Sequence, residues 1–139
     1  MNKLVPYIMV ALVLIPVPCQ ASRDVNELTT ETREKFYELA ELAGRAGKDL
    51  RLLCTYRSQE SQDKLFAKGR TSPGKKVTWT RRSKHTRRIA FDIAVVKDGR
   101  ISWKPEDYLY LGRLAEKVGL TWGGNWKVRD YGHFELKSN

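Results

Sequence analysis

The sequence contains few of the residues that build disulfides and metal sites. Its 139 residues include two cysteines, Cys19 and Cys54, and two histidines, His85 and His133. A scaffold held together by disulfides is therefore excluded, since such domains carry many cysteines in a short chain. No internal repeat, low-complexity segment or linker follows residue 22. One compact domain over residues 22–139 is the simplest organisation.

Charge is nearly absent from the first 21 residues, where Lys3 is the only charged side chain and residues 4–17 are almost all apolar. This layout predicts a secretory signal peptide over residues 1–21, with cleavage after Ala21. The apolar run is shorter than the roughly 20 residues that a membrane-spanning helix needs, and prolines shorten it further. An uncleaved signal-anchor that is slowly released stays open as the alternative. Pro18, directly before Cys19, argues against a lipoprotein signal.

Acidic residues are fewer than basic ones, 16 against 26, which gives a net charge of +10. Such a charge predicts an anionic partner, and export favours an acidic wall polymer over nucleic acid. No recognisable nucleic-acid-binding motif is present, so we expect no nucleic acid partner. We expect a monomer in the periplasm or cell wall that contacts the membrane only transiently, through its leader.

Hydrophobic residues make up 41% of the chain, which is enough for a core. Their spacing predicts helices over residues 30–46, 58–69 and 105–119. Strand patterns lie over 50–56, 89–96, 101–103 and 132–136, with a hairpin at Asp98-Gly99 and a loop over 122–126. This irregular order predicts an α+β fold, in which a small, mainly antiparallel sheet has flanking helices.

The strand predicted over residues 89–96 separates two kinds of side chain. Phe91 and Ile93 lie on an apolar face, whereas Asp92 lies among small residues on the other face. Asp92, His85 and His133 supply the three protein ligands of a catalytic zinc site, which leaves a fourth position for water. At this point two ordinary surface or core histidines remain the alternative interpretation.

The residues around His133 favour the metal site. Asp130 lies three residues earlier and Gly132 lets the backbone turn, so this second carboxylate can act as a general base toward water. Glu135 shares a strand face with His133 and either orients it or forms a solvated ion pair. Cys54 lies in an apolar strand and is predicted to be a buried packing thiol without a nucleophilic role, and a bridge between Cys19 and Cys54 stays open only if the leader is not cleaved.

These residues resemble a known family, the zinc L-alanyl-D-glutamate endopeptidases of phage endolysins and bacterial wall enzymes, which are relatives of the VanY-type D-alanyl-D-alanine carboxypeptidases. The family's zinc motif, S-x-H-x-x-G-x-A-x-D, is matched by Ser83, His85, Ala90 and Asp92. Its second motif is a loop rich in tryptophan and glycine followed by D-x-x-H-F-E, and residues 122–126 and 130–135 match it. The resemblance covers roughly residues 50–136.

The resemblance implies a hedgehog/D-Ala-D-Ala-peptidase-like fold and a zinc peptidase that cleaves peptidoglycan stem peptides between L-alanine and D-glutamate. Carried over by position, it implies that His85, Asp92 and His133 bind zinc and that Asp130 is the general base. It further implies an oxyanion-stabilising Arg57 and a substrate-binding Ser83. A surface ion pair is the alternative for Arg57. A D-alanyl-D-alanine carboxypeptidase or dipeptidase, or a catalytically weak wall-binding module, are the alternatives for the protein.

Two positions depart from the family's pattern. Arg88 stands at its glycine position, and Thr86 at its usual asparagine. If that glycine serves a positive φ, we expect Arg88 to strain the loop that carries His85. The same segment contains a basic cluster that can attract the carboxylates of stem peptides: Arg81, Arg82, Lys84, Arg87 and Arg88.

Overall fold

The structure is a computed structural model that describes residues 21–138. The predicted signal peptide, residues 1–21, lies outside the described residues except for Ala21. In the part of the chain that is described, no helix combines the length and the apolar composition needed to cross a membrane.

Five strands form one sheet in which all strand pairings are antiparallel. Its order is β1 (Asp49–Cys54), β2 (Ala90–Lys97), β5 (His133–Leu136) and β4 (Leu120–Trp122), and β3 (Arg100–Ser102) pairs with the second half of β2. Asp98 and Gly99 connect β2 to β3 with φ values of 51° and 72°, the positive values that a two-residue hairpin of this kind requires. The predicted hairpin and antiparallel sheet are confirmed.

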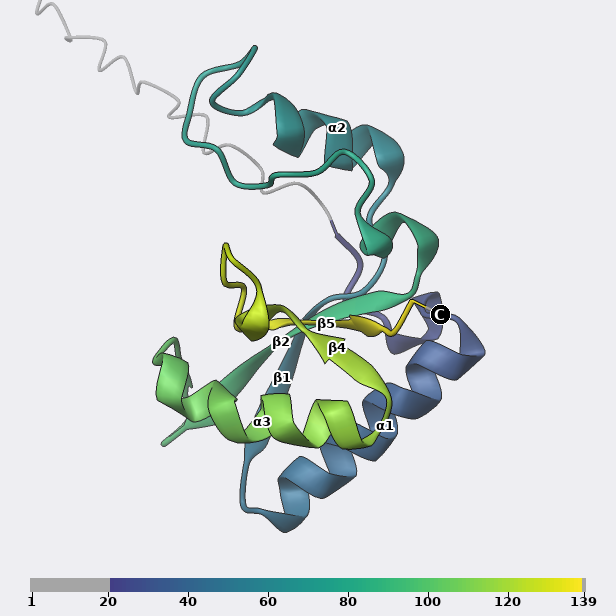
Figure 1. The fold of residues 1–139 in the computed structure, drawn as a ribbon, viewed down its shortest axis with the longest axis vertical. Coiled ribbons are helices and arrows are strands. Elements are labelled where there is room, and N and C mark those ends of the chain that lie inside the picture. The colour runs from purple at the N-terminus through teal and green to yellow at the C-terminus, as the bar shows by residue number, and fades with distance from the viewer. Residues whose placement is uncertain (1–20, 139) are drawn as a thin grey trace, which may run out of the picture.

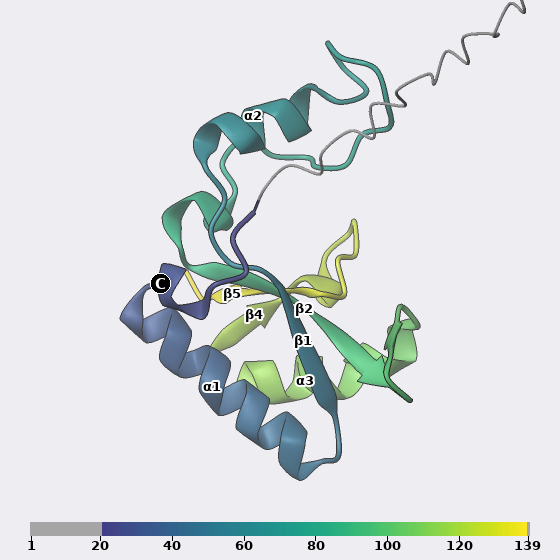
Figure 2. The same cartoon turned by 180° about the vertical axis from the view of Figure 1, so that it is seen from behind.

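Two helices cover one side of the sheet. Figures 1 and 2 show α1 (Thr30–Arg45) and α3 (Pro105–Lys117) together on this side, whereas α2 (Gln59–Ala67) lies on the other side. Thr29 and Ser58 cap α1 and α2 by accepting from backbone N–H groups, and Pro105 opens α3. The α+β fold class predicted from the sequence is thereby confirmed.

The strand β4 corrects one prediction, because the sequence pattern indicated only a helix end and a loop there. Three residues are too few to show a strand period, and pairing with β5 decides the conformation. Trp122 at the end of β4 is only 5% exposed and lies over Gly112 of α3, where an added Cβ would lie 2.1 Å from the indole. Residues 123–125 of the predicted loop form a short 3-10 turn, η3 (Gly123–Asn125).

The two faces of the sheet have different chemistry. Phe91, Ile93 and Val95 of β2 are fully buried and join Phe134 of β5 in the core beneath α1 and α3. Side chains alternate across a strand, so Asp92 lies on the opposite face, as the sequence predicts. That face looks toward α2 and the long loop after it, and its polar side chains are therefore available for chemistry.

Candidate active site

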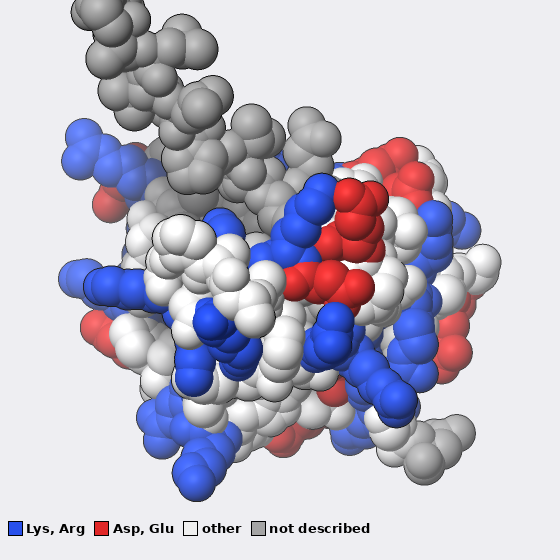
Figure 3. All heavy atoms as spheres, turned by 90° about the horizontal axis from the view of Figure 1, so that it is seen from above, with Lys and Arg blue, Asp and Glu red and all other residues white. Residues whose placement is uncertain are grey.

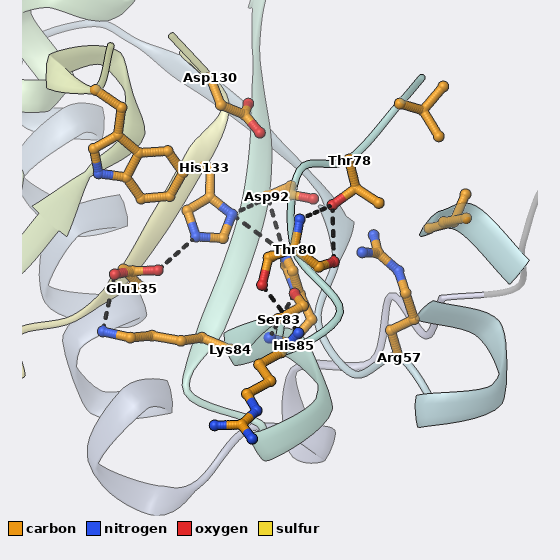
Figure 4. A pocket seen from close by; sticks show the side chains of 14 residues that line it. Arg57, Thr78, Thr80, Ser83, Lys84, His85, Asp92, Asp130, His133 and Glu135 are labelled. Carbon is orange, nitrogen blue, oxygen red and sulfur yellow. Dashed lines mark hydrogen bonds and ion pairs between the residues drawn. The ribbon is translucent and has the colours of Figure 1, made fainter. Parts of the chain in front are cut away.

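His85, Asp92 and His133 meet on the polar face of the sheet (Figure 4). His85 Nε2 lies 3.1 Å from Asp92 Oδ1 and 3.2 Å from His133 Nδ1, and His133 Nδ1 lies 3.0 Å from the same Asp92 oxygen. Ligand atoms bound tetrahedrally to zinc at about 2.0–2.1 Å lie about 3.3–3.4 Å apart. The spacing of these three atoms is thus close to that of one face of a zinc coordination sphere.

The tautomer of His85 is fixed by the backbone. His85 belongs to η2 (Lys84–Arg87) and is 2% exposed, and its Nδ1 lies 2.8 Å from the carbonyl oxygen of Thr55. A carbonyl can only accept, so Nδ1 carries the hydrogen and Nε2 presents its lone pair toward Asp92 and His133. Sequence reasoning missed this role of Thr55, since a backbone acceptor leaves no signal in residue identity.

The tautomer of His133 is fixed by a carboxylate. Its Nε2 lies 3.0 Å from Oε2 of Glu135, and Oε1 of Glu135 accepts from Lys84 Nζ at 2.9 Å. The hydrogen of His133 therefore lies on Nε2, and Nδ1 presents a lone pair to the same point as His85 Nε2. Both contacts considered for Glu135 are present, since it lies against His133 and also forms an ion pair with Lys84. The sequence did not predict this role for Lys84, whose ammonium group holds Glu135 in this position.

With both rings neutral in these tautomers, three acceptor atoms converge, and either a proton or a metal ion must lie between them. Burial lowers the pKa of His85, but its hydrogen bonds with Asp92 and Cys54 outweigh burial and raise the pKa to about 10. Burial raises the pKa of Asp92, but its hydrogen bonds with both histidines outweigh burial and hold the pKa far below its ordinary value. Such a group of atoms stabilises positive charge, so these three side chains are suited as ligands of a divalent cation.

Sheet register aligns this group. Asp92 of β2 pairs with His133 of β5 on one side and with Cys54 of β1 on the other, beyond a bulge in β1. The buried Cys54 Sγ lies 3.5 Å from His85 Nδ1, so Cys54, His85 and Asp92 form a second geometric set of possible metal ligands. A cation there would compete with the Thr55 carbonyl for Nδ1, so the set with His133 is the better donor group. Cys54 is buried as predicted, but its contact with the site was missed.

Asp130 lies at the edge of the site. Figure 4 shows its carboxylate turned toward the pocket beside His133 and Asp92. Burial and the negative charge of Asp92 raise its pKa. Gly123 allows this placement, because a Cβ at that position would lie 2.6 Å from the Asp130 carbonyl oxygen. A carboxylate with a raised pKa beside a cation site is suited to exchange protons with water.

Arg57 lines the same pocket. Its Nη1 donates to Gln62 Oε1 at 2.9 Å and its Nη2 to Cys54 Sγ at 3.6 Å, while its buried Nε has no hydrogen-bond partner among the described residues. The surface ion pair considered for Arg57 is absent from the ion pairs of the described residues. Ser83 also lines the pocket, where its hydroxyl accepts from His85 N–H and caps η2.

The pocket has a volume of about 480 Å³ and cations line part of it, namely Arg57, Arg82 and Lys84. Figure 3 views the molecule from the side of α2 and shows Lys and Arg side chains spread widely over this face, with Asp and Glu side chains between them in several places. Asp92, Asp130 and Glu135 line the same pocket, so it offers both cations for a substrate carboxylate and carboxylates beside the metal site.

Arg88 adopts the left-handed backbone conformation that the family's glycine at this position suggests. Its φ is 63° and its ψ is 25°, in the left-handed region, where it ends η2 three residues after His85. The side chain forms an ion pair with Glu27, and its guanidinium lies 4.0 Å from the centre of the Tyr56 ring. These contacts offset part of the backbone strain, and His85 keeps its place in the site.

Comparisons with known proteins identify relatives of this chain. A family model described as D-alanyl-D-alanine carboxypeptidase matches residues 76–136, the stretch that carries His85, Asp92, Asp130 and His133. The peptidoglycan L-alanyl-D-glutamate endopeptidase CwlK of Bacillus subtilis (strain 168) is 33% identical over 142 residues, which cover 93% of this chain and 81% of CwlK. The chain belongs to this peptidase family. The predicted relationship to wall peptidases is confirmed.

Solved structures of other peptidases share the fold. The Serratia marcescens L-Ala D-Glu endopeptidase ChiX is similar with a TM-score of 0.63 at 23% identity, over 85% of this chain and 89% of ChiX. The D,D-pentapeptidase VanY of a VanB-type resistance cassette, solved in complex with Zn(II), is similar with a TM-score of 0.58 at 18% identity, over 78% of this chain and 72% of VanY. At these identities the likeness establishes the fold alone, which agrees with the fold that the sequence predicts.

Proposed function

We propose that this peptidase is an exported enzyme that uses zinc to hydrolyse the bond between L-alanine and D-glutamate in peptidoglycan stem peptides. The observation that carries the proposal is the convergence of three acceptor atoms, from His85, Asp92 and His133, with both histidine tautomers fixed from behind. A proton or a metal can satisfy such a group, and its spacing fits zinc. The 33% identity to CwlK supports the choice of scissile bond.

Bound by these three residues, zinc supplies Lewis acidity, which polarises a carbonyl and lowers the pKa of coordinated water. Asp130 takes a proton from the attacking water and returns it to the leaving amine. Its raised pKa brings it closer to neutral pH, where both transfers are effective. Arg57 faces the pocket with a fixed positive charge, which stabilises the negative charge that develops on the carbonyl oxygen. Ser83 contributes to substrate binding at the pocket wall.

Two experiments test the proposal. Purified muropeptides are digested with the zinc-loaded protein and analysed by mass spectrometry, beside Asp130→Ala and a control, Asp49→Ala, at the exposed start of β1. We expect a product with a new D-glutamate amino terminus from the wild type and from Asp49→Ala, and none from Asp130→Ala. Zinc content after dialysis is measured on the same samples and on His133→Ala, which we expect to lose the metal. Absence of the new terminus in the wild-type digest would contradict the proposal.

A D-alanyl-D-alanine carboxypeptidase is the second candidate, because the matching family model carries that description. The same metal site would then act on a terminal D-alanine. Release of free D-alanine in the digest, without a new D-glutamate terminus, would identify this activity.

A further inference from the structure

A groove of about 530 Å³ opens beside the catalytic pocket, between residues 77–80 and 126–130. The two cavities share five lining residues: Val77, Thr78, Thr80, Trp126 and Asp130. The groove is therefore a continuation of the catalytic cleft, and a substrate bound at the metal site can extend into it.

Apolar side chains in this groove are unusually exposed. Trp79 is 61% exposed, Val77 57%, Val128 52% and Trp126 37%. They are four of the eight large hydrophobic residues that are exposed in the described part of the chain. Exposed apolar residues that gather in one place, instead of lying singly, are typical of a binding surface.

The wall formed by residues 77–80 is braced from behind. Gln62 is fully buried and donates to the Thr80 carbonyl at 2.7 Å, and Arg70 donates to the Thr78 carbonyl at 3.1 Å. These carbonyls are already paired, and the segment forms no strand, so the wall offers little backbone for the addition of a peptide strand. The wall presents the aromatic ring of Trp79 and other side chains on a backbone that is held in place, which favours a ligand that stacks on an aromatic ring.

Resting on the proposed function, we propose that this groove binds an N-acetylated sugar ring of the glycan strand that bears the stem peptide. The L-alanine at the scissile bond is joined through a lactyl group to N-acetylmuramic acid, so a sugar lies directly beyond the reacting residue. One face of a pyranose ring consists of C–H groups that can pack on an indole such as that of Trp79. Its hydroxyl and acetamido groups can bond to polar side chains at the rim, where Lys127 and Arg129 lie.

The test compares two substrates of the zinc-loaded protein, an N-acetylmuramoyl peptide and the same peptide with a lactyl group and no sugar. We expect kcat/KM of the wild type to be about tenfold higher for the substrate with the sugar, because the binding energy of one stacked ring corresponds to about that ratio. Trp79→Ala should remove this preference and leave kcat/KM for the sugar-free peptide within about twofold. Tyr37→Ala, which alters an aromatic residue of α1 that is 53% exposed, is the matched control and should keep the preference.

Equal kcat/KM of the wild type for the two substrates would overturn the proposal, as would an equal loss on both substrates in Trp79→Ala. If Trp79→Ala keeps the preference and loses binding to phosphatidylglycerol vesicles, the groove is a membrane contact and the sugar site is wrong. Should Trp79→Ala not fold, Val128→Ser on the opposite wall replaces it. A wild type that cleaves neither substrate refutes the proposed function. In that case calorimetric titration with the disaccharide of N-acetylglucosamine and N-acetylmuramic acid decides the groove, and no heat of binding would overturn it.

Discussion

Lys84 Nζ lies 2.9 Å from Oε1 of Glu135, whose other carboxylate oxygen accepts from the ring of His133. Both partners of this ion pair are largely buried, with 17% and 13% of their side chains exposed. Hydrogen bonds to the Leu136 carbonyl and the Ser138 hydroxyl hold the ammonium in place. The loop that carries His85 is thereby tied to the strand that carries His133.

Lys84→Met should weaken zinc binding. Without the ammonium, Glu135 is no longer fixed against His133, and loss of such an outer partner costs about tenfold or more in metal affinity. Competition with a chromogenic chelator measures the dissociation constant. Ser138→Ala, which removes only one of the hydrogen bonds to Lys84, is the control and should bind zinc as the wild type does. Unchanged affinity in Lys84→Met would contradict a positioning role.

Asp130→Asn should lower kcat by about 10²–10⁴-fold, the usual contribution of a general base, while zinc content stays the same. The pKa of Asp130 is raised above its ordinary 3.8, and only the ionised carboxylate accepts a proton. Activity should therefore be lost as the pH falls through this raised pKa, above the range of an ordinary aspartate. A pH profile of kcat, with zinc content measured at each pH, checks this. An acid limb that persists unchanged in Asp130→Asn would show that another group acts.

Removal of zinc with a chelator should lower the melting temperature. Zinc held by His85, Asp92 and His133 is a ligand of the folded state, and such a ligand stabilises that state by about 2.7 kcal/mol at a hundredfold excess over Kd. Differential scanning calorimetry with and without zinc measures the shift. The melting temperature of His133→Ala should not respond to zinc, and an equal response in both proteins would place the metal elsewhere.

Gly112→Ala should destabilise the protein, because its Cβ would lie 2.1 Å from the buried Trp122 ring and overpacking costs about 1–3 kcal/mol. Gly44→Ala in α1 is the matched control, since no atom lies within 4 Å of its added Cβ. There the usual gain of about 0.5–1 kcal/mol for alanine in a helix is expected. Urea denaturation gives both free energies of unfolding, and the same sign for both variants would contradict the packing argument.

Two substitutions, Arg88→Gly and Arg88→Ala, distinguish the cost of the backbone strain at Arg88 from the stabilisation by its side-chain contacts. Alanine keeps the cost of the left-handed conformation and loses the contacts with Tyr56 and Glu27, so a loss of about 1–2 kcal/mol is expected. Glycine loses the same contacts but relieves about 1–2 kcal/mol of strain, so its stability should stay within about 1 kcal/mol of the wild type. Urea denaturation curves of the wild type and both variants check this order of stability. A glycine variant less stable than the alanine variant would be inconsistent with strain at this position.

The sequence predicts those parts of the fold that rest on local chemistry. Thr29 and Ser58 mark helix starts by their capping side chains, and the alternation around Asp92 places this carboxylate opposite the core. The strand β4 was not predictable, because only its pairing with β5 defines it. In the site, residue types pointed to His85 and His133. The Thr55 carbonyl and the Cys54 thiol join the site through the register of neighbouring strands, which residue identity does not reveal.

The register between β2 and β5 also affects when the enzyme can become active. Asp92 faces His133 only after β5 pairs with β2, and the two residues lie 41 positions apart in the chain. A partly folded chain in which β5 is unpaired has His85 and Asp92 but not the third donor. We therefore expect hydrolytic activity to appear only with the last step of sheet assembly, which would keep an incompletely folded chain inert during its synthesis.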